Sequence, residues 1–111
     1  MNKKTILIDL DGVLNNYTCY DENNIPPIKD GVREFLQKIY ITNEYDIVLF
    51  TTRNLLLATM WLIENKIDKY FKDITNIKIP AYIYIDDRAI RFNGDFIKLY
   101  DDIKNFNVYW K

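Results

Sequence analysis

The apolar residues of this chain gather in three short runs, which we interpret as strands. They cover residues 5–10, 46–51 and 82–85. Continuous apolar runs of this length, without strict alternation, are typical of strands buried on both faces of a parallel sheet. A weaker run at residues 71–77 predicts a short edge strand, and residues 108–110 predict a final strand.

Helical spacing of apolar residues fills the stretches between these runs. A first helix is predicted after a cap at Asp30, with apolar residues at i, i+3, i+4 and i+7: Val32, Phe35, Leu36 and Ile39. A second helix is predicted from a cap at Asn54 to about Lys66. A third carries one apolar stripe: Phe96, Leu99, Ile103 and Phe106. Asn93-Gly94, just before it, predicts a tight turn within a small hairpin.

Strands that alternate with helices define the expected fold class. We predict one α/β domain over residues 1–111, a three-layer, doubly wound (Rossmann-like), mostly parallel sheet with helices on both faces. Residues 13–29 form a long loop rich in Asn, Asp and Pro, a length more typical of functional loops. Neither the stretch 11–51 nor the stretch 53–78 has room for a second domain, which needs about 50 residues. We therefore expect no cap domain.

Composition narrows the chemistry that is open to this chain. It has no histidine, which excludes a Ser-His-Asp triad and an HExxH zinc site. Its single cysteine, Cys19, excludes an internal disulfide and fits the reduced cytoplasm where we expect the protein. No apolar segment is long enough for a membrane span. Its 15 Lys+Arg against 16 Asp+Glu argue against a strong basic field for nucleic acid.

Polar residues stand at the end of each predicted strand, where α/β proteins bind their ligands. They are Asp9, Asp11, Thr51, Thr52, Arg53, Asp86 and Asp87. Four carboxylates at one edge would repel one another unless a cation lay among them. Oxygen ligands select a hard cation, and Mg²⁺ is favoured because it pairs with phosphate. With a Thr hydroxyl and a Lys ammonium nearby, the sequence predicts a phosphoryl-transfer site.

The order of these residues resembles the four motifs of the haloacid dehalogenase superfamily. The matching residues are Asp9-Leu10-Asp11-Gly12-Val13, Thr51, Lys78 and Asp86-Asp87. The resemblance covers nearly the whole chain and implies a Mg²⁺-dependent phosphatase of the small, capless type. Asp11 points to phosphate chemistry, because the dehalogenase branch lacks this second aspartate.

The resemblance also implies a role for each motif residue. Asp9 would attack phosphorus and form an aspartyl-phosphate, while Asp11 would serve as general acid and then as general base. Thr51 and Lys78 would hold the phosphoryl oxygens, and Lys78 is preferred over the other nearby lysines because its loop leads into the strand before Asp86. The Mg²⁺ ligands would be Asp9, the backbone carbonyl of Asp11, Asp86 and, as a ligand or just behind the ligands, Asp87.

Three residues are candidates for substrate binding: Thr52, Arg53 and Arg88. Their surroundings, Thr51-Thr52-Arg53 and Asp86-Asp87-Arg88, resemble compact family members that include the 3′-phosphatase domain of phage polynucleotide kinase-phosphatases. Arg53 would grip a substrate phosphate or orient Asp11, and both arginines are equally explained as ion-pair partners of the acidic cluster. An open site favours the exposed phosphate of a macromolecule, and a nucleic-acid end is the alternative to a general phosphomonoester.

Two other classes compete with a phosphatase. Receiver domains also place carboxylates, a Thr and a Lys on such a sheet, but their adjacent acidic pair belongs to the first strand, and here it follows a later one. A non-catalytic member that only binds a phosphorylated ligand stays open as an alternative. The Tyr and Trp residues are interpreted as core and surface filler.

Overall fold

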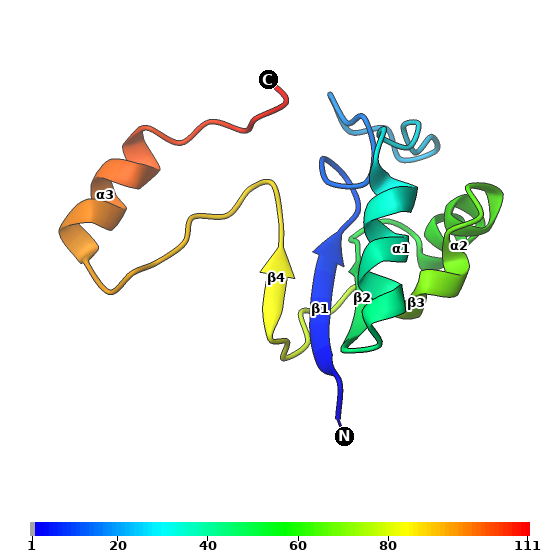
Figure 1. The fold of residues 1–111 in the computed structure, drawn as a ribbon. Coiled ribbons are helices and arrows are strands. Elements are labelled where there is room, and N and C mark those ends of the chain that lie inside the picture. Colours follow the sequence, from blue (N-terminus) through cyan, green and yellow to red (C-terminus); the bar gives the residue numbers. More distant parts are fainter. Residues whose placement is uncertain (1) are drawn as a thin grey trace.

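One parallel sheet organises the protein, whose computed structural model describes residues 2–111 (Figure 1). Within these residues, four strands follow the order β3-β2-β1-β4. They are β1 (Lys4–Asp9), β2 (Tyr45–Phe50), β3 (Phe71–Thr75) and β4 (Ile83–Ile85). The helices are α1 (Val32–Thr42), α2 (Leu55–Glu64), α3 (Phe96–Lys104) and the short η1 (Asp68–Tyr70). The predicted α/β fold with a parallel sheet is confirmed.

The core lies between one face of the sheet and the helices α1 and α2. β1 and β2 pair in parallel over their whole length, and this register sets Ile8 beside Leu49 on the covered face. Leu36 from α1 and Leu62 from α2 pack in the same cluster, and each of these four side chains is at most 1 % exposed. Each contributes about 1.5–3 kcal/mol by its burial, so this cluster holds the strands and the two helices together.

The other face of the sheet is covered by the connection between β3 and β4. These two parallel strands lie at opposite edges, so the chain crosses the sheet to join them. Leu7 points to this face, opposite to its neighbours in β1, and lines a hollow together with Lys78 of the connection and Tyr84 of β4. The Tyr84 hydroxyl donates to the carbonyl of Ile79, which fixes the connection against the strand. Leu7 is thereby only 4 % exposed.

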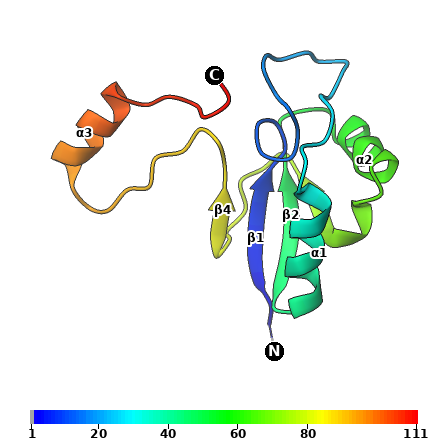
Figure 2. The ribbon, with the colours of Figure 1, turned by 45° about the horizontal axis from the view of Figure 1, so that its top comes forward.

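The helix α3 lies apart from the sheet, on the side of β4 (Figures 1 and 2). None of its residues is buried within the described chain, and Phe96 and Ile97 are 74 % and 82 % exposed. The prediction of helices on both faces is therefore wrong in this respect: both packed helices share one face. The physical reason is that the β3–β4 connection already covers the other. Among residues 2–111, no helix is both long and apolar enough to cross a bilayer.

The two predicted helix caps have different outcomes. Asn54 caps α2 as expected, since its Oδ1 accepts a hydrogen bond of 3.1 Å from the Leu57 N–H. Asp30 does not cap α1. The residue before that helix is Gly31, whose φ of 90° is left-handed, and no side chain bonds the first turn. The backbone carbonyl of Lys29 accepts from the Val32 N–H instead.

The chain after β4 departs furthest from the sequence prediction. Residues 86–95 contain no hairpin in the structure, although Gly94 does turn with a φ of 97°. Residues 108–110 form no strand either. Val108 is buried, while Tyr109 and Trp110 contact the edge of the sheet where the predicted site lies. The apolar pattern there reflects this docking rather than strand pairing.

Candidate metal centre

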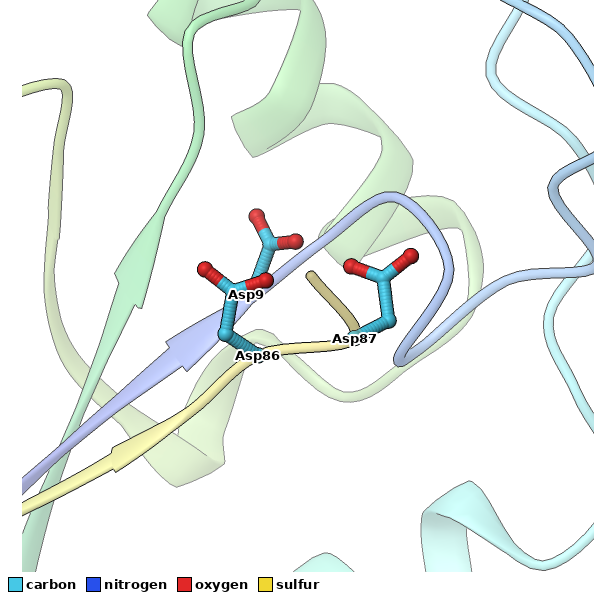
Figure 3. A group of neighbouring side chains, drawn as sticks. All are labelled: Asp9, Asp86 and Asp87. Atoms are coloured by element: carbon cyan, nitrogen blue, oxygen red, sulfur yellow. The ribbon is translucent and has the colours of Figure 1, made fainter. Parts of the chain in front are cut away.

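Three carboxylates meet at the carboxyl edge of the sheet: Asp9, Asp86 and Asp87 (Figure 3). Asp9 ends β1, and the other two follow β4, which pairs with β1 through Ile8 and Ile85. One ligand oxygen from each carboxylate lies within 4.8 Å of the others. The structure thus brings together three of the four residues predicted to hold the metal.

The electrostatics of this group favour a cation. Burial raises the pKa of Asp9 from 3.8 to about 8, and the neighbouring charge of Asp86 and contact with Asp87 raise it further in the same direction. Such a shift means that the ionised form is unfavourable without a compensating positive charge. A bound Mg²⁺ or Ca²⁺ would supply that charge, and a donor set of carboxylate oxygens is the kind that both ions prefer. The residues present therefore fit a hard divalent cation.

Gly12 brings the turn after β1 directly against this group. Its φ of 84° lies in the left-handed region, and a Cβ at this position would lie 2.1 Å from Oδ2 of Asp87. Only glycine combines this backbone conformation with such a close approach. The glycine of the Asp-x-Asp-Gly sequence is thus required by the packing of two predicted motifs against each other.

The carboxylate of Asp11 has other partners than the three acidic side chains. Its Oδ2 accepts from Nε of Arg53 at 2.8 Å, and its Oδ1 accepts from Nδ2 of Asn15 at 2.9 Å. The Arg53 side chain is 1 % exposed, so this ion pair is sheltered from water. Asp11 was expected to offer the metal its backbone carbonyl, and the position of its side chain leaves that expectation open.

Arg53 links the site to the long loop of residues 13–29. Its Nη1 donates to the backbone carbonyl of Asp21 at 2.6 Å, and its guanidinium lies 5.0 Å from the ring centre of Tyr20. Nη2 is buried without a hydrogen-bond partner among residues 2–111. Of the two roles considered for Arg53, the contacts here are those of a residue that orients Asp11.

The remaining motif residues lie at the same edge of the sheet. Thr51 follows β2, is 2 % exposed, and its Oγ1 accepts from the Arg53 N–H at 3.1 Å. Thr52 is exposed. Lys78 lines a hollow of ≈ 130 Å³ together with Asp9 and Asp86. The structure therefore places a lysine beside the carboxylates, as the sequence predicts.

The competing lysines lie elsewhere. Lys72 pairs with Asp46 at 3.3 Å, near the amino end of β2 and so at the opposite edge of the sheet. Lys66 and Lys69 precede β3, which places them toward the amino ends of the strands. Among these candidates, Lys78 is the one that shares a hollow with the acidic residues.

The end of the chain supplies contacts that sequence reasoning missed. Nε1 of Trp110 donates to Oδ2 of Asp87 at 2.6 Å, and the Tyr109 hydroxyl donates to the backbone carbonyl of Gly12. Arg88 stacks its guanidinium on the Trp110 ring, 5.2 Å from its centre, and its N–H donates to Asp86 Oδ1 at 2.8 Å. The interpretation of the tryptophans as filler is wrong for Trp110.

Asn15 was also missed, although its position carried a signal. It is fully buried, and its Oδ1 accepts from the Gly12 N–H at 3.1 Å while its amide donates to Asp11. A buried asparagine must satisfy both ends of its amide, and a local turn four residues after an aspartate allows this. No comparable signal marks Trp110, because its partner Asp87 is distant in the sequence.

Comparisons with known proteins add support for the fold. No family model matches the chain, and no curated protein matches it. A solved structure of a conserved protein from Bacteroides thetaiotaomicron is similar, with a TM-score of 0.60 and 22 % sequence identity. The match covers 93 % of this chain and 91 % of that one. At this identity the similarity shows a shared fold.

Proposed function

We propose that this protein is a Mg²⁺-dependent phosphatase of the haloacid dehalogenase type, acting on a phosphomonoester. The observation that carries the proposal is the meeting of Asp9, Asp86 and Asp87 at one edge of the sheet. Lys78 in the adjoining hollow adds the positive charge that a phosphoryl group requires. Carboxylates for a cation beside a lysine for the phosphate are the components of phosphoryl transfer.

The proposed first step belongs to Asp9. One of its oxygens attacks phosphorus, and the bond between phosphorus and the ester oxygen breaks. The leaving oxygen takes a proton from Asp11, while Lys78 and Thr51 hold the phosphoryl oxygens. When bound, Mg²⁺ neutralises charge on the carboxylates and on the phosphoryl group.

The second step releases the phosphate. Asp11 takes a proton from a water molecule, and that water attacks phosphorus. The bond between phosphorus and Asp9 breaks, which restores the carboxylate and gives inorganic phosphate. Splitting one displacement into two steps in this way is the advantage of covalent catalysis.

The contacts of Asp11 set a condition on this mechanism. Both of its oxygens accept hydrogen bonds from well-buried partners, Arg53 and Asn15. To protonate a leaving group, Asp11 must release at least one of them when substrate binds. Arg53 and Asn15 then act as positioning residues, because they hold Asp11 beside the site until that moment.

A phosphatase assay with a colorimetric aryl phosphate tests the proposal. We expect turnover with Mg²⁺, none with EDTA, and none from Asp9→Asn. Asp101→Asn is a matched control, since it removes one charge from the exposed helix α3. Undiminished turnover by Asp9→Asn, or in EDTA, would exclude the mechanism.

A second candidate is favoured by the same contacts of Asp11. If Arg53 and Asn15 never release it, the protein binds phosphorylated ligands without turning them over. Acetyl phosphate separates the two candidates, because its leaving group needs little help from an acid. Phosphorylation of Asp9 by acetyl phosphate, without turnover of any alkyl phosphate, would favour the binding protein.

A further inference from the structure

A second hollow lies beside the candidate metal centre, against the Asp11-Gly12 turn. Its volume is ≈ 330 Å³, and its walls include Tyr17, Tyr109 and Trp110. Two of these walls touch the site itself: Trp110 bonds Asp87, and Tyr109 bonds the carbonyl of Gly12. A molecule in this hollow would therefore lie one side chain away from the carboxylates.

The aromatic walls are arranged to enclose a flat ring. The rings of Tyr17 and Trp110 meet edge to face, with centres 5.1 Å apart and planes at 78°. Arg88 covers part of the Trp110 ring at 5.2 Å, which restricts how that ring can turn. Aromatic side chains held in this way offer faces on which a flat ligand ring stacks.

The rim of the hollow is polar. Asn16 and Thr18 line it and are exposed. Lys29 donates to Asn16 Oδ1 at 3.4 Å and lies 5.4 Å from the centre of the Tyr109 ring. An amide, a hydroxyl and an ammonium offer both donors and acceptors to the edge of a heterocycle.

We propose that this hollow binds the base of a nucleotide whose phosphate occupies the site at Asp9. The proposal rests on the phosphatase function proposed above and names its substrate class. In a nucleotide, a sugar separates the base from the phosphate, as the Asp11-Gly12 turn separates the hollow from Asp9. An aryl phosphate such as phosphotyrosine carries its phosphate on the ring, and does not meet this separation.

Steady-state kinetics with matched substrates test the proposal. Adenosine 5′-monophosphate and ribose 5-phosphate share the phosphate and the sugar, and adenosine 3′-monophosphate and a 3′-phosphorylated oligonucleotide show which source of nucleotide is preferred. We expect a nucleotide to exceed ribose 5-phosphate in kcat/KM by about ten- to a hundredfold, the scale of one stacked base. We expect Tyr17→Ala to remove most of this preference and to leave the rate on ribose 5-phosphate unchanged.

Tyr40→Ala is the matched control, because it removes an exposed tyrosine from α1. Equal kcat/KM values for nucleotide and ribose 5-phosphate in the wild type, or equal losses on both in Tyr17→Ala, would overturn the proposal. Circular dichroism of each variant confirms that it is folded.

A binding measurement separates this proposal from the phosphatase function. Adenosine monophosphate should quench the fluorescence of Trp110 in the wild type and in Asp9→Asn, and the quenching should be absent in Trp110→Phe. If no phosphate ester is turned over but this quenching occurs, the phosphatase function fails and the base-binding hollow stands. Turnover of phosphate esters without nucleotide quenching would retain the phosphatase and reject the hollow.

Discussion

The two parts of this molecule are held in place by different forces. From β1 to β3, a cluster of fully buried aliphatic side chains joins α1 and α2 to one face of the sheet. After β4, the chain has one residue that is clearly buried, Val108, and α3 has none. What anchors this second part is a set of polar and aromatic contacts made by Tyr109 and Trp110 to Gly12 and Asp87.

This difference suggests a division of labour. Burial in the first part sets the stability of the fold, while the anchoring contacts of the second part shape the site without contributing much to the core. Changes in the first part should therefore unfold the protein, and changes near the end of the chain should alter binding. The predictions below test this division.

The largest effect is expected in the core. Leu36→Ala should lower the free energy of unfolding by about 2–5 kcal/mol, because it leaves a cavity at a fully buried position. Ile97→Ala, in the exposed helix α3, should change it by less than about 0.5 kcal/mol. Urea denaturation measures both. A large loss in Ile97→Ala would mean that α3 packs against the sheet after all.

The next effect concerns charge at the site. Lys78→Ala should lower kcat by about a hundred- to a thousandfold, the scale of one group that stabilises charge in a transition state. Lys72→Ala should leave kcat unchanged, since Lys72 pairs with Asp46 at the opposite edge. If Lys72→Ala is the impaired variant, the third motif has been misplaced.

A smaller effect is expected where the end of the chain meets the metal centre. Trp110→Phe keeps an aromatic ring and removes the donor to Asp87, so it should weaken Mg²⁺ binding by about tenfold. Isothermal titration calorimetry measures this affinity, and Trp61→Phe serves as a control for the loss of an indole N–H elsewhere. Equal affinities in Trp110→Phe and in the wild type would show that this contact does not position Asp87.

The smallest effect is a dependence of stability on pH in the metal-free protein. The pKa of Asp9 is about 8 in the folded state against 3.8 unfolded, so between these values the folded state binds the extra proton. Its contribution to stability is then complete below about pH 4 and is lost as the pH rises towards 8. The difference in Tm between the wild type and Asp9→Asn isolates this contribution. A difference that is constant from pH 5 to 8 would contradict the raised pKa.

Much of the fold could be predicted because its signals are local. Apolar runs mark the strands, and Asn54 marks the start of α2. The meeting of Asp9 with Asp86 and Asp87 could also be predicted, because parallel strands expose their carboxyl ends at one edge.

The rest depends on contacts between residues far apart in the sequence. The Tyr109 hydroxyl bonds Gly12 across 97 positions, and no periodicity or turn residue announces such a contact. The missing second helix layer has the same origin, since only the path of the β3–β4 connection decides what covers Leu7. The chemical roles of Thr51, Lys78 and Arg88 stay predictions that the kinetic experiments address.

The central claim is that Asp9 is a nucleophile in a Mg²⁺-dependent centre. Mass spectrometry of the intact protein after incubation with acetyl phosphate tests it most directly. We predict one added phosphoryl group with Mg²⁺, located on Asp9 by peptide mapping, and absent both in EDTA and in Asp9→Asn. A phosphoryl group on another residue, or no adduct even in Asp11→Asn, where its hydrolysis is blocked, would contradict the account.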